Sequence, residues 1–191
     1  MSEGKLLLFC GPSGSGKTTI VQHLLKTDPR LAFSISATTR KKRDNEIEGV
    51  DYYFLNIEDF RKRIDENRFI EWEEVYSGGY YGTLRSEIDK IWSLGKTPLF
   101  DVDVEGGLKI KKIFGDNLLA VFVCPPSVEE LHKRLFARNS ETPESFKTRI
   151  TKSEHELTYS FRFDKVIVND DLKFALKEAR ILANDFLERK E

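Results

Sequence analysis

The chain has few cysteines and no long apolar run. Only Cys10 and Cys124 occur among its 191 residues, and each ends an apolar, strand-like run. Two such cysteines are typical of small core residues, which argues against a disulfide framework or a cysteine metal site. No apolar run reaches the length of a membrane span. An apolar strand follows Met1 closely and leaves no room for a cleavable signal, so we expect a cytoplasmic protein without a membrane partner.

Neither sign of charge predominates. The chain has 31 lysines and arginines and 32 aspartates and glutamates, which gives a formal net charge of −1. Without a global field, general nucleic-acid binding is disfavoured, and we expect no nucleic-acid partner. The three histidines, His23, His132 and His155, lie in helical stretches without matching partners, so we interpret them as surface or packing residues.

Apolar β-type runs recur along the chain, and each is followed by a helical pattern. Continuous apolar runs suit strands that are covered on both faces. We therefore predict an α/β fold in which helices sandwich a parallel sheet. Ser127 with Glu130 makes a capping box, and Asp171 can cap the last helix. The runs cover 6–10, 98–102, 118–123 and 166–168, and the helical patterns cover 18–25, 108–114, 128–136 and 174–187.

One long segment, 34–94, does not follow this alternation. It concentrates tyrosines and arginines and holds a predicted helix over 57–67 between strand-like pieces. That composition suits a small, partly β lobe with a polar binding face. We predict three parts, which are a core of 1–33 and 95–191, an insert of 34–94, and a second polar segment, 137–150, within the core.

The most informative stretch lies between the first predicted strand and its helix. Its glycines lack a Cβ, so the loop can wrap around an anion and aim its N–H groups inward. The positive end of the following helix adds to the attraction. Lys17 can reach the β- and γ-phosphates, and the Thr18 hydroxyl can ligate Mg²⁺. The stretch fits G-x-x-x-x-G-K-[ST] and consists of Gly11, Pro12, Ser13, Gly14, Ser15, Gly16, Lys17 and Thr18.

The flanking strand and helix disfavour the alternative, which is a glycine- and serine-rich turn without function. We therefore predict a loop that binds a nucleoside triphosphate together with Mg²⁺. Phosphoryl transfer then asks the protein for charge neutralisation and alignment, and for little covalent work.

Two aspartates end the predicted strand at 98–102. Alternation along a strand would turn Asp101 and Asp103 to the same side. An acidic residue at the carboxyl end of a core strand is well placed to hold the water shell of Mg²⁺, and we assign Asp101 to the metal. Two solvated strand-end carboxylates are the alternative, and these residues alone do not decide between the two.

Arginines from three places complete the predicted site. Arg40 and Arg43 begin the insert, and their planar guanidinium groups would bind a phosphomonoester bidentately. Arg134 and Arg138 are four residues apart on one helix face, and Arg149 lies on the next helix. If the segment between them folds over the nucleotide, these arginines would surround the transferring phosphoryl group. A run of cations is usually a solvated face, so each is weak evidence alone.

Taken in order, the motifs closely resemble those of guanylate kinase. Besides the phosphate loop, they are Ser36-Ala37-Thr38-Thr39-Arg40 with Arg43, Asp51-Tyr52, Phe69-Ile70-Glu71-Trp72, Tyr80-Tyr81-Gly82-Thr83, Asp101-Val102-Asp103, Pro125-Pro126-Ser127 and Val168-Asn169-Asp170-Asp171. The resemblance runs nearly end to end. It implies a nucleotide-binding core, an acceptor-binding lobe and a mobile lid at 137–150. It also implies transfer of the ATP γ-phosphoryl group to GMP or dGMP, giving GDP from GMP, in purine nucleotide metabolism.

The resemblance also implies roles for individual residues. Asp103 would reach the guanine edge, and Asn169 would belong to the ATP site. Guanine presents an N1–H and an amino group as adjacent donors, which Glu71 can accept, while the Thr83 hydroxyl can donate to O6. Adenine reverses this pattern and would leave buried polar groups unpaired. The residues implied to hold the acceptor phosphate are Ser36, Arg40, Arg43, Tyr52 and Tyr81.

Some positions depart from the family pattern. Lys42 stands where a proline is usual, and Asn45 and Asn139 stand where glycine is common. Asparagine tolerates a left-handed backbone well, so we expect the turns to survive and only loop stiffness and rate to change.

Two other functions compete with this interpretation. A catalytically silent module of the same fold would bind phosphorylated protein partners, but it would not need the Gly16-Lys17-Thr18 end of the loop. A related kinase acting on a sugar phosphate is disfavoured by Glu71 and Thr83, which suit a base edge. Whether the protein is a monomer or a homo-oligomer stays open.

Overall fold

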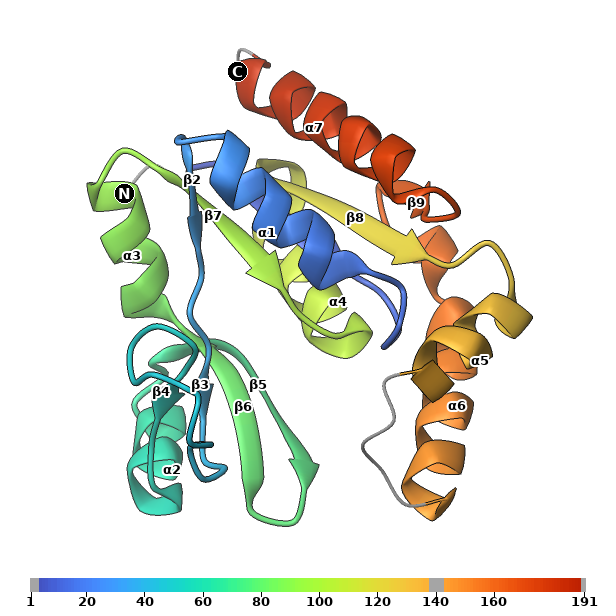
Figure 1. The fold of residues 1–191 in the computed structure, drawn as a ribbon. Coiled ribbons are helices and arrows are strands. Elements are labelled where there is room, and N and C mark those ends of the chain that lie inside the picture. Colours follow the sequence, from blue (N-terminus) through green and yellow to red (C-terminus); the bar gives the residue numbers. More distant parts are fainter. Residues whose placement is uncertain (1–3, 138–142, 190–191) are drawn as a thin grey trace.

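A five-stranded parallel sheet forms the centre of the protein (Figure 1). The computed structural model describes residues 4–137 and 143–189. The strands are β1 (Leu6–Cys10), β2 (Leu31–Phe33), β7 (Thr97–Asp101), β8 (Leu118–Cys124) and β9 (Lys165–Val168). Their order is β2-β7-β1-β8-β9, and every pair of neighbours runs parallel. The predicted parallel α/β core is confirmed.

Helices cover both faces of this sheet, which explains why its central strand β1 is apolar and buried at every position. In β1, Leu7 and Phe9 pack on one face, whereas Leu6 and Leu8 pack on the other. Burial of each such side chain stabilises the fold by about 1.5–3 kcal/mol. The first face is covered by α1 (Lys17–Thr27) and α7 (Leu172–Glu188), and the second by α3 (Arg85–Ser93) and α4 (Val104–Phe114).

Two core elements differ from the predicted pattern. Strand β2 was not predicted, because its 3 residues are too few to show a period. Helix α4 begins at Val104 rather than at 108, because glycines in its first turns hide the helical pattern. One of them, Gly107, permits close packing on the sheet, since a Cβ there would lie 3.3 Å from Leu8 Cδ2.

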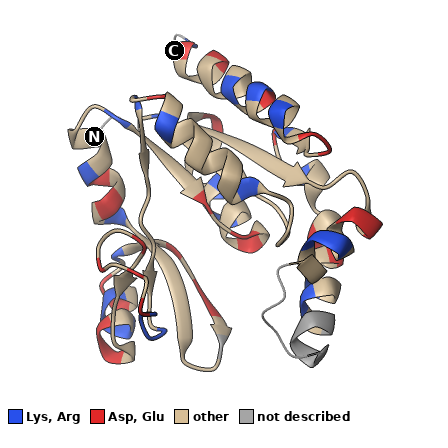
Figure 2. Ribbon diagram, in the orientation of Figure 1, with Lys and Arg blue, Asp and Glu red and all other residues tan. Residues whose placement is uncertain are grey.

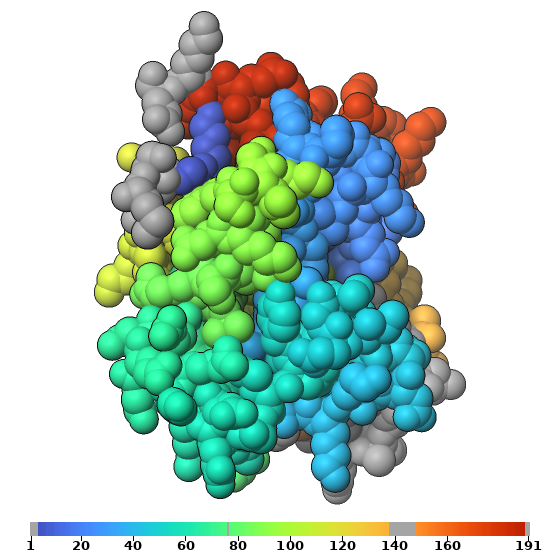
Figure 3. Space-filling view, turned by 90° about the vertical axis from the view of Figure 1, so that its left-hand side faces the viewer, coloured from blue at the N-terminus to red at the C-terminus, as the bar shows by residue number. Residues whose placement is uncertain are grey.

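The insert folds into a lobe with its own sheet and core, drawn below the main sheet in Figure 1. Phe60 stacks on Phe69 and Tyr80, with ring centroids 4.3 and 5.3 Å apart. In the space-filling view, the lobe lies directly under the core on this face (Figure 3). Its elements are β3 (Ala37–Thr38), β4 (Tyr53–Phe54), α2 (Ile57–Asp65), β5 (Phe69–Tyr76) and β6 (Gly79–Leu84), and the strand order is β4-β3-β6-β5.

Helix α3 joins the lobe to the core. Its Ile88 packs in the core cluster beneath the main sheet. Its Glu87 is only 3% exposed and accepts a hydrogen bond from the Tyr53 hydroxyl of the lobe at 2.7 Å. Burial, with Glu87 as a neighbour, raises the pKa of Tyr53. Because α3 contacts both parts, the division of the chain at residue 94 stays a prediction.

Two further helices, α5 (Val128–Ala137) and α6 (Pro143–Leu157), lie at the right of Figure 1. The Glu130 N–H donates to Ser127 Oγ at 3.2 Å, so Ser127 caps α5 as predicted. Asp171 likewise caps α7 and accepts from the Lys173 N–H at 2.7 Å.

Residues 138–142, which include Arg138 and Asn139, lie outside the described residues, and the lid at 137–150 stays a prediction.

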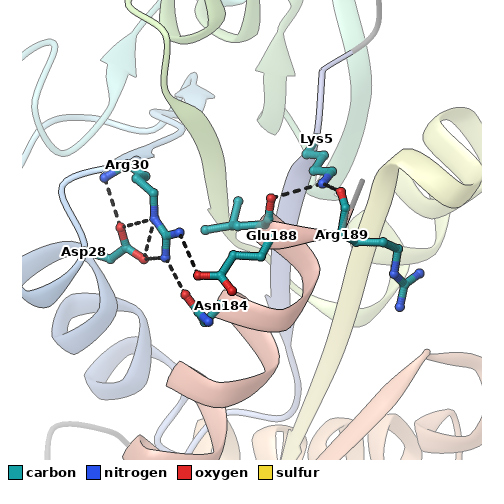
Figure 4. Close-up of polar contacts among 7 residues, drawn as sticks. Lys5, Asp28, Arg30, Asn184, Glu188 and Arg189 are labelled. Atoms are coloured by element: carbon teal, nitrogen blue, oxygen red, sulfur yellow. Dashed lines mark hydrogen bonds and ion pairs between the residues drawn. The ribbon is translucent and has the colours of Figure 1, made fainter. Parts of the chain in front are cut away.

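Two groups of polar contacts join α7 to segments near the N-terminus of the chain (Figure 4). The Arg30 guanidinium donates to the Asp28 carboxylate at 2.9 and 2.6 Å and to Asn184 Oδ1 on α7 at 3.0 Å. Near the end of α7, Lys5 Nζ donates to the Leu187 carbonyl at 3.1 Å and also to the Arg189 carbonyl. These contacts tie α7 to the chain that precedes β2 and β1.

Charged residues of both signs are spread over the helices and loops, and the strands of the main sheet carry few (Figure 2). Among the described helices, none is both long enough and apolar enough to cross a membrane.

Candidate active site

The glycine-rich loop lies between β1 and α1 and has a backbone that only glycine adopts easily. Gly11 and Gly16 have φ values of +143° and +91°. A Cβ on Gly11 would lie 2.1 Å from the Val123 carbonyl oxygen, and one on Gly16 would lie 2.2 Å from Asn169 Nδ2. Asn169 in turn donates from Nδ2 to the Ser15 carbonyl at 2.8 Å, so it braces the loop from behind.

The loop lines a cavity of about 220 Å³ together with residues from α4 and α6. These residues are Asp103, Arg149, Lys152, Ser153 and Glu156. The cavity is thus lined by the phosphate loop and by three cations, Lys17, Arg149 and Lys152, which suits a polyphosphate, and by two carboxylates, Asp103 and Glu156.

Lys17, Thr18 and Asp101 meet at the mouth of this loop. The Thr18 hydroxyl donates to Asp101 Oδ2 at 2.7 Å, and Lys17 Nζ lies 3.5 Å from Asp101 Oδ1. The parallel register pairs Asp101 with Phe9, next to the end of β1. This pairing places the carboxylate of β7 beside the phosphate loop, as the carboxyl ends of parallel strands require.

Asp103 belongs to a different element from the predicted one. Strand β7 ends at Asp101, so strand alternation does not set the direction of Asp103, and that part of the prediction is wrong. Asp103 is instead the N-cap of α4, and its Oδ1 accepts from the Gly106 N–H at 2.9 Å. Its Oδ2 lies 3.7 Å from Lys152 Nζ.

Glu71 and Thr83 face each other across the β5–β6 pair. They are partners in the antiparallel register, and the Thr83 hydroxyl donates to Glu71 Oε1 at 2.7 Å. Glu71 is 9% exposed and Thr83 is fully buried, and burial raises the pKa of Glu71. Because a hydroxyl has a single proton, Thr83 can donate either to Glu71 or to a base oxygen, but not to both.

The predicted acceptor-phosphate residues gather around Arg40. Its guanidinium binds the Glu46 carboxylate through two hydrogen bonds of 2.7 and 2.5 Å. This ion pair holds the pKa of Glu46 down at about 2. The Tyr52 ring centroid lies 5.0 Å from the guanidinium carbon of Arg40, and Tyr81 meets Tyr52 edge-on at 6.1 Å.

Arg43 and Ser36 contribute through their backbones. The Arg43 N–H donates to Glu46 Oε2 at 2.8 Å, while its side chain is exposed. The Ser36 carbonyl accepts from the Tyr53 N–H at 2.9 Å and so helps to join β3 to β4. Arg40, Tyr52 and Tyr81 therefore form one cluster of side chains in contact, whereas the Arg43 side chain lies at its exposed rim.

The three remaining arginines differ in position. Arg149 on α6 donates from Nη2 to Ser13 Oγ of the phosphate loop at 2.8 Å. Arg134 on α5 pairs with Glu130 at 2.9 Å. Arg138 lies outside the described residues.

Three site residues were not predicted from the sequence. Glu46 occupies the guanidinium of Arg40, Lys152 pairs with Asp103, and Glu156 lines the phosphate-loop cavity at 8% exposure. Burial raises the pKa of Glu156 to about 7. In the sequence, the only sign of Lys152 and Glu156 as site residues is their four-residue spacing on one helix face. Such spacing is common on solvated helices.

The fold and this geometry together define a P-loop kinase. A parallel sheet carries a phosphate loop between β1 and α1, with a strand-end carboxylate at its lysine and threonine. A separate lobe presents an arginine–tyrosine cluster and a buried carboxylate, which suit a second phosphate and a base.

Comparison with known proteins identifies the family within this class. The sequence model described as guanylate kinase matches residues 3–185. The guanylate kinase of Bacteroides thetaiotaomicron is 50% identical over 186 residues, which cover 97% of this chain and 91% of that protein. That of Bacteroides fragilis is 48% identical over 185 residues, with the same coverage.

A solved structure agrees. The crystal structure of guanylate kinase from Anaplasma phagocytophilum superposes with a TM-score of 0.75 at 26% identity, over 100% of this chain and 89% of that one. The chain belongs to the guanylate kinase family.

Proposed function

We propose that this enzyme transfers the γ-phosphoryl group of ATP to GMP, giving ADP and GDP, and that it accepts dGMP as well. Membership of the family supports this reaction. The observation that carries the choice of acceptor is the buried Glu71 on β5, a carboxylate oriented by the hydroxyl of its partner Thr83. None of the assigned acceptor residues is committed to the ribose 2′-hydroxyl, which is the only group that dGMP lacks.

The phosphate loop, from Gly11 to Thr18, would cradle the ATP phosphates, with Asn169 bracing it. Lys17 would neutralise charge on the β- and γ-phosphates. Arg149 already contacts Ser13 of the loop, and we assign Arg134 and Arg138 to the same transferring group.

The residues at the mouth of the loop fit Mg²⁺. Thr18 Oγ1 and Asp101 Oδ2 are hard oxygen donors 2.7 Å apart. Among the described residues there is no group of three or more His, Cys, Asp or Glu side chains that could hold a metal. This arrangement suits an ion held by one carboxylate, a hydroxyl and substrate phosphates. When bound, Mg²⁺ would offset the charge that develops on the phosphoryl oxygens.

The acceptor would bind in the lobe. The GMP phosphate would displace Glu46 from Arg40 and gain a bidentate partner there. Ser36, Arg43, Tyr52 and Tyr81 would complete the phosphate site. Glu71 would accept from guanine N1–H and the amino group, with Asp103 at the same base edge. Thr83 would orient Glu71 or, once its hydroxyl turns, donate to O6.

Calorimetric titration of the purified chain tests this proposal against the silent binding module. We expect ATP with Mg²⁺ and GMP each to bind to one site. A Lys17→Ala variant should lose most of its ATP affinity and keep its GMP affinity. Absence of ATP binding to the unaltered chain would contradict the proposal.

A further inference from the structure

Helix α6 carries two cations one turn apart over the active site. Arg149 contacts Ser13 of the phosphate loop at 2.8 Å. Lys152 Nζ lies 3.7 Å from Asp103 Oδ2, at the start of α4. Both cations line the cavity of the phosphate loop, and Lys152 also reaches Asp103, the residue assigned to the guanine edge.

Asp103 lies between the two nucleotide sites. A Cβ built on Gly106 would lie 3.3 Å from Asp103 Oδ1 and 3.4 Å from Glu71 Oε2, so both carboxylates flank the same point of α4. Asp103 also lines the cavity of the phosphate loop. Its Oδ1 is committed to the helix cap, which leaves Oδ2 as the oxygen that can face a ligand.

Carboxylates surround this position. The charge of Asp103 contributes to raising the pKa of Glu71, of Glu73 and of Glu156. Lys152 Nζ lies 3.8 Å from Glu156 Oε1 as well as near Asp103, so one ammonium group offsets two of these charges. Without that cation, repulsion from its carboxylate neighbours would turn Asp103 Oδ2 away from them.

We propose that Lys152 is a positioning residue for the acceptor, because its ion pair with Asp103 Oδ2 holds that oxygen toward the guanine amino group. The inference rests on the proposed role of Asp103 at the guanine edge. Lys152 itself touches no reacting atom in this role. It acts on GMP binding through a carboxylate and leaves the ATP phosphates to Lys17 and Arg149.

Steady-state kinetics of Lys152→Gln test the inference. We expect the KM for GMP to rise about two- to fivefold, the size of effect expected for a half-exposed ion pair. The KM for ATP and kcat should change by less than about twofold on the same scale. Lys152→Arg should restore the KM for GMP, because it keeps the charge. Lys177→Gln, an exposed lysine of α7, is the matched control and should behave as the unaltered enzyme.

A double-mutant cycle with Asp103→Asn shows whether Lys152 acts through Asp103. Asparagine is a good N-cap, so this variant should keep α4 intact. In the Asp103→Asn background, Lys152→Gln should have no further effect on the KM for GMP. A full effect there would overturn the inference, and so would a rise in the KM for ATP alone.

The same cycle separates this inference from the function on which it rests. If Asp103→Asn weakens GMP binding and Lys152→Gln does not, the inference on Lys152 is wrong and the role of Asp103 stands. If Asp103→Asn leaves the KM for GMP unchanged, the role of Asp103 fails, and the inference fails with it.

Discussion

At the scale of single residues, the proposed choice of base rests on the buried pair of Glu71 and Thr83. The Thr83 hydroxyl already donates to one carboxylate oxygen, and the other oxygen lies near the start of α4. A carboxylate accepts hydrogen bonds and donates none when it is ionised, which matches the two adjacent donors of guanine. Its raised pKa reflects the burial that also makes an unpaired group costly.

We predict that Glu71→Gln lowers kcat/KM for GMP on the order of 10²-fold, because the amide nitrogen presents a donor to the donors of guanine. The KM for ATP should change by less than about threefold. Glu74→Gln on the same strand is exposed and serves as the control. A Glu71→Gln enzyme with an unaltered preference for GMP over AMP would mean that the base is recognised elsewhere.

Glu156 makes the stability of the protein depend on pH. Its pKa is raised from 4.5 to about 7 by burial, so the folded state holds this proton more tightly than the unfolded state. Stability is therefore lost as pH rises from about 4.5 through 7.

We predict that Glu156→Gln removes this loss. The variant should match the unaltered protein at about pH 4.5 and exceed its free energy of unfolding by about 1–3 kcal/mol at pH 8. Urea unfolding at both pH values measures the difference, with Glu178→Gln on α7 as an exposed control. A difference that stays constant with pH would show that Glu156 does not titrate in this way.

Single residues were predictable where a motif fixes them. Lys17, Thr18 and Asp101 are examples, because the loop motif and the end of the strand determine where these side chains lie. Glu46 and Lys152 were not, since their roles come from partners that only the fold brings within reach, at 2.5 Å from Arg40 and 3.7 Å from Asp103. For Asp103, we expected strand alternation to set the direction of the side chain. The residue is instead the N-cap of α4.

At the scale of elements, the phosphate loop depends on its packing against β8 and on Asn169. The Gly16 position has a left-handed backbone, and a Cβ there would meet Asn169 Nδ2 at 2.2 Å. That nitrogen is the donor that holds the Ser15 carbonyl. A change at Gly16 therefore disturbs the loop through both its own backbone and its support.

We predict that Gly16→Ala destabilises the protein by about 1–3 kcal/mol through backbone strain. It should also weaken ATP binding by about tenfold or more, while GMP binding changes little. Gly95→Ala separates the two effects, because Gly95 has a φ of +68° and nothing within 4 Å of a Cβ. It should lower the melting temperature and keep ATP affinity. Equal ATP affinities in both variants would contradict the proposed role of Gly16 in shaping the ATP-binding loop.

Most core elements could be predicted, because continuous apolar runs and marked helix caps identify them. Strand β2 is too short for a pattern, and the glycines at the start of α4 serve packing rather than helix propensity. The sheet of the lobe was harder still. Its β3 and β4 have 2 residues each, and their parallel pairing depends on a long connection that leaves no local signature.

At the scale of the whole molecule, the chain packs into a core and a lobe that share part of one apolar cluster through Ile70 of β5. The core has an apolar cluster on each face of its sheet, and the lobe has its own cluster around Phe60. Helix α3 and the Glu87–Tyr53 hydrogen bond join them. The proposed donor site thus lies on the core and most of the proposed acceptor site on the lobe, and transfer would require the two sites to face one another.

The most direct measurement of the proposed function is ADP release in a coupled assay with Mg²⁺ and ATP, using GMP, dGMP, AMP or UMP as the acceptor. We predict turnover with GMP, with dGMP next, and little with AMP or UMP, because only guanine offers two adjacent donors to Glu71. Faster turnover with AMP than with GMP would contradict the assignment of the acceptor site.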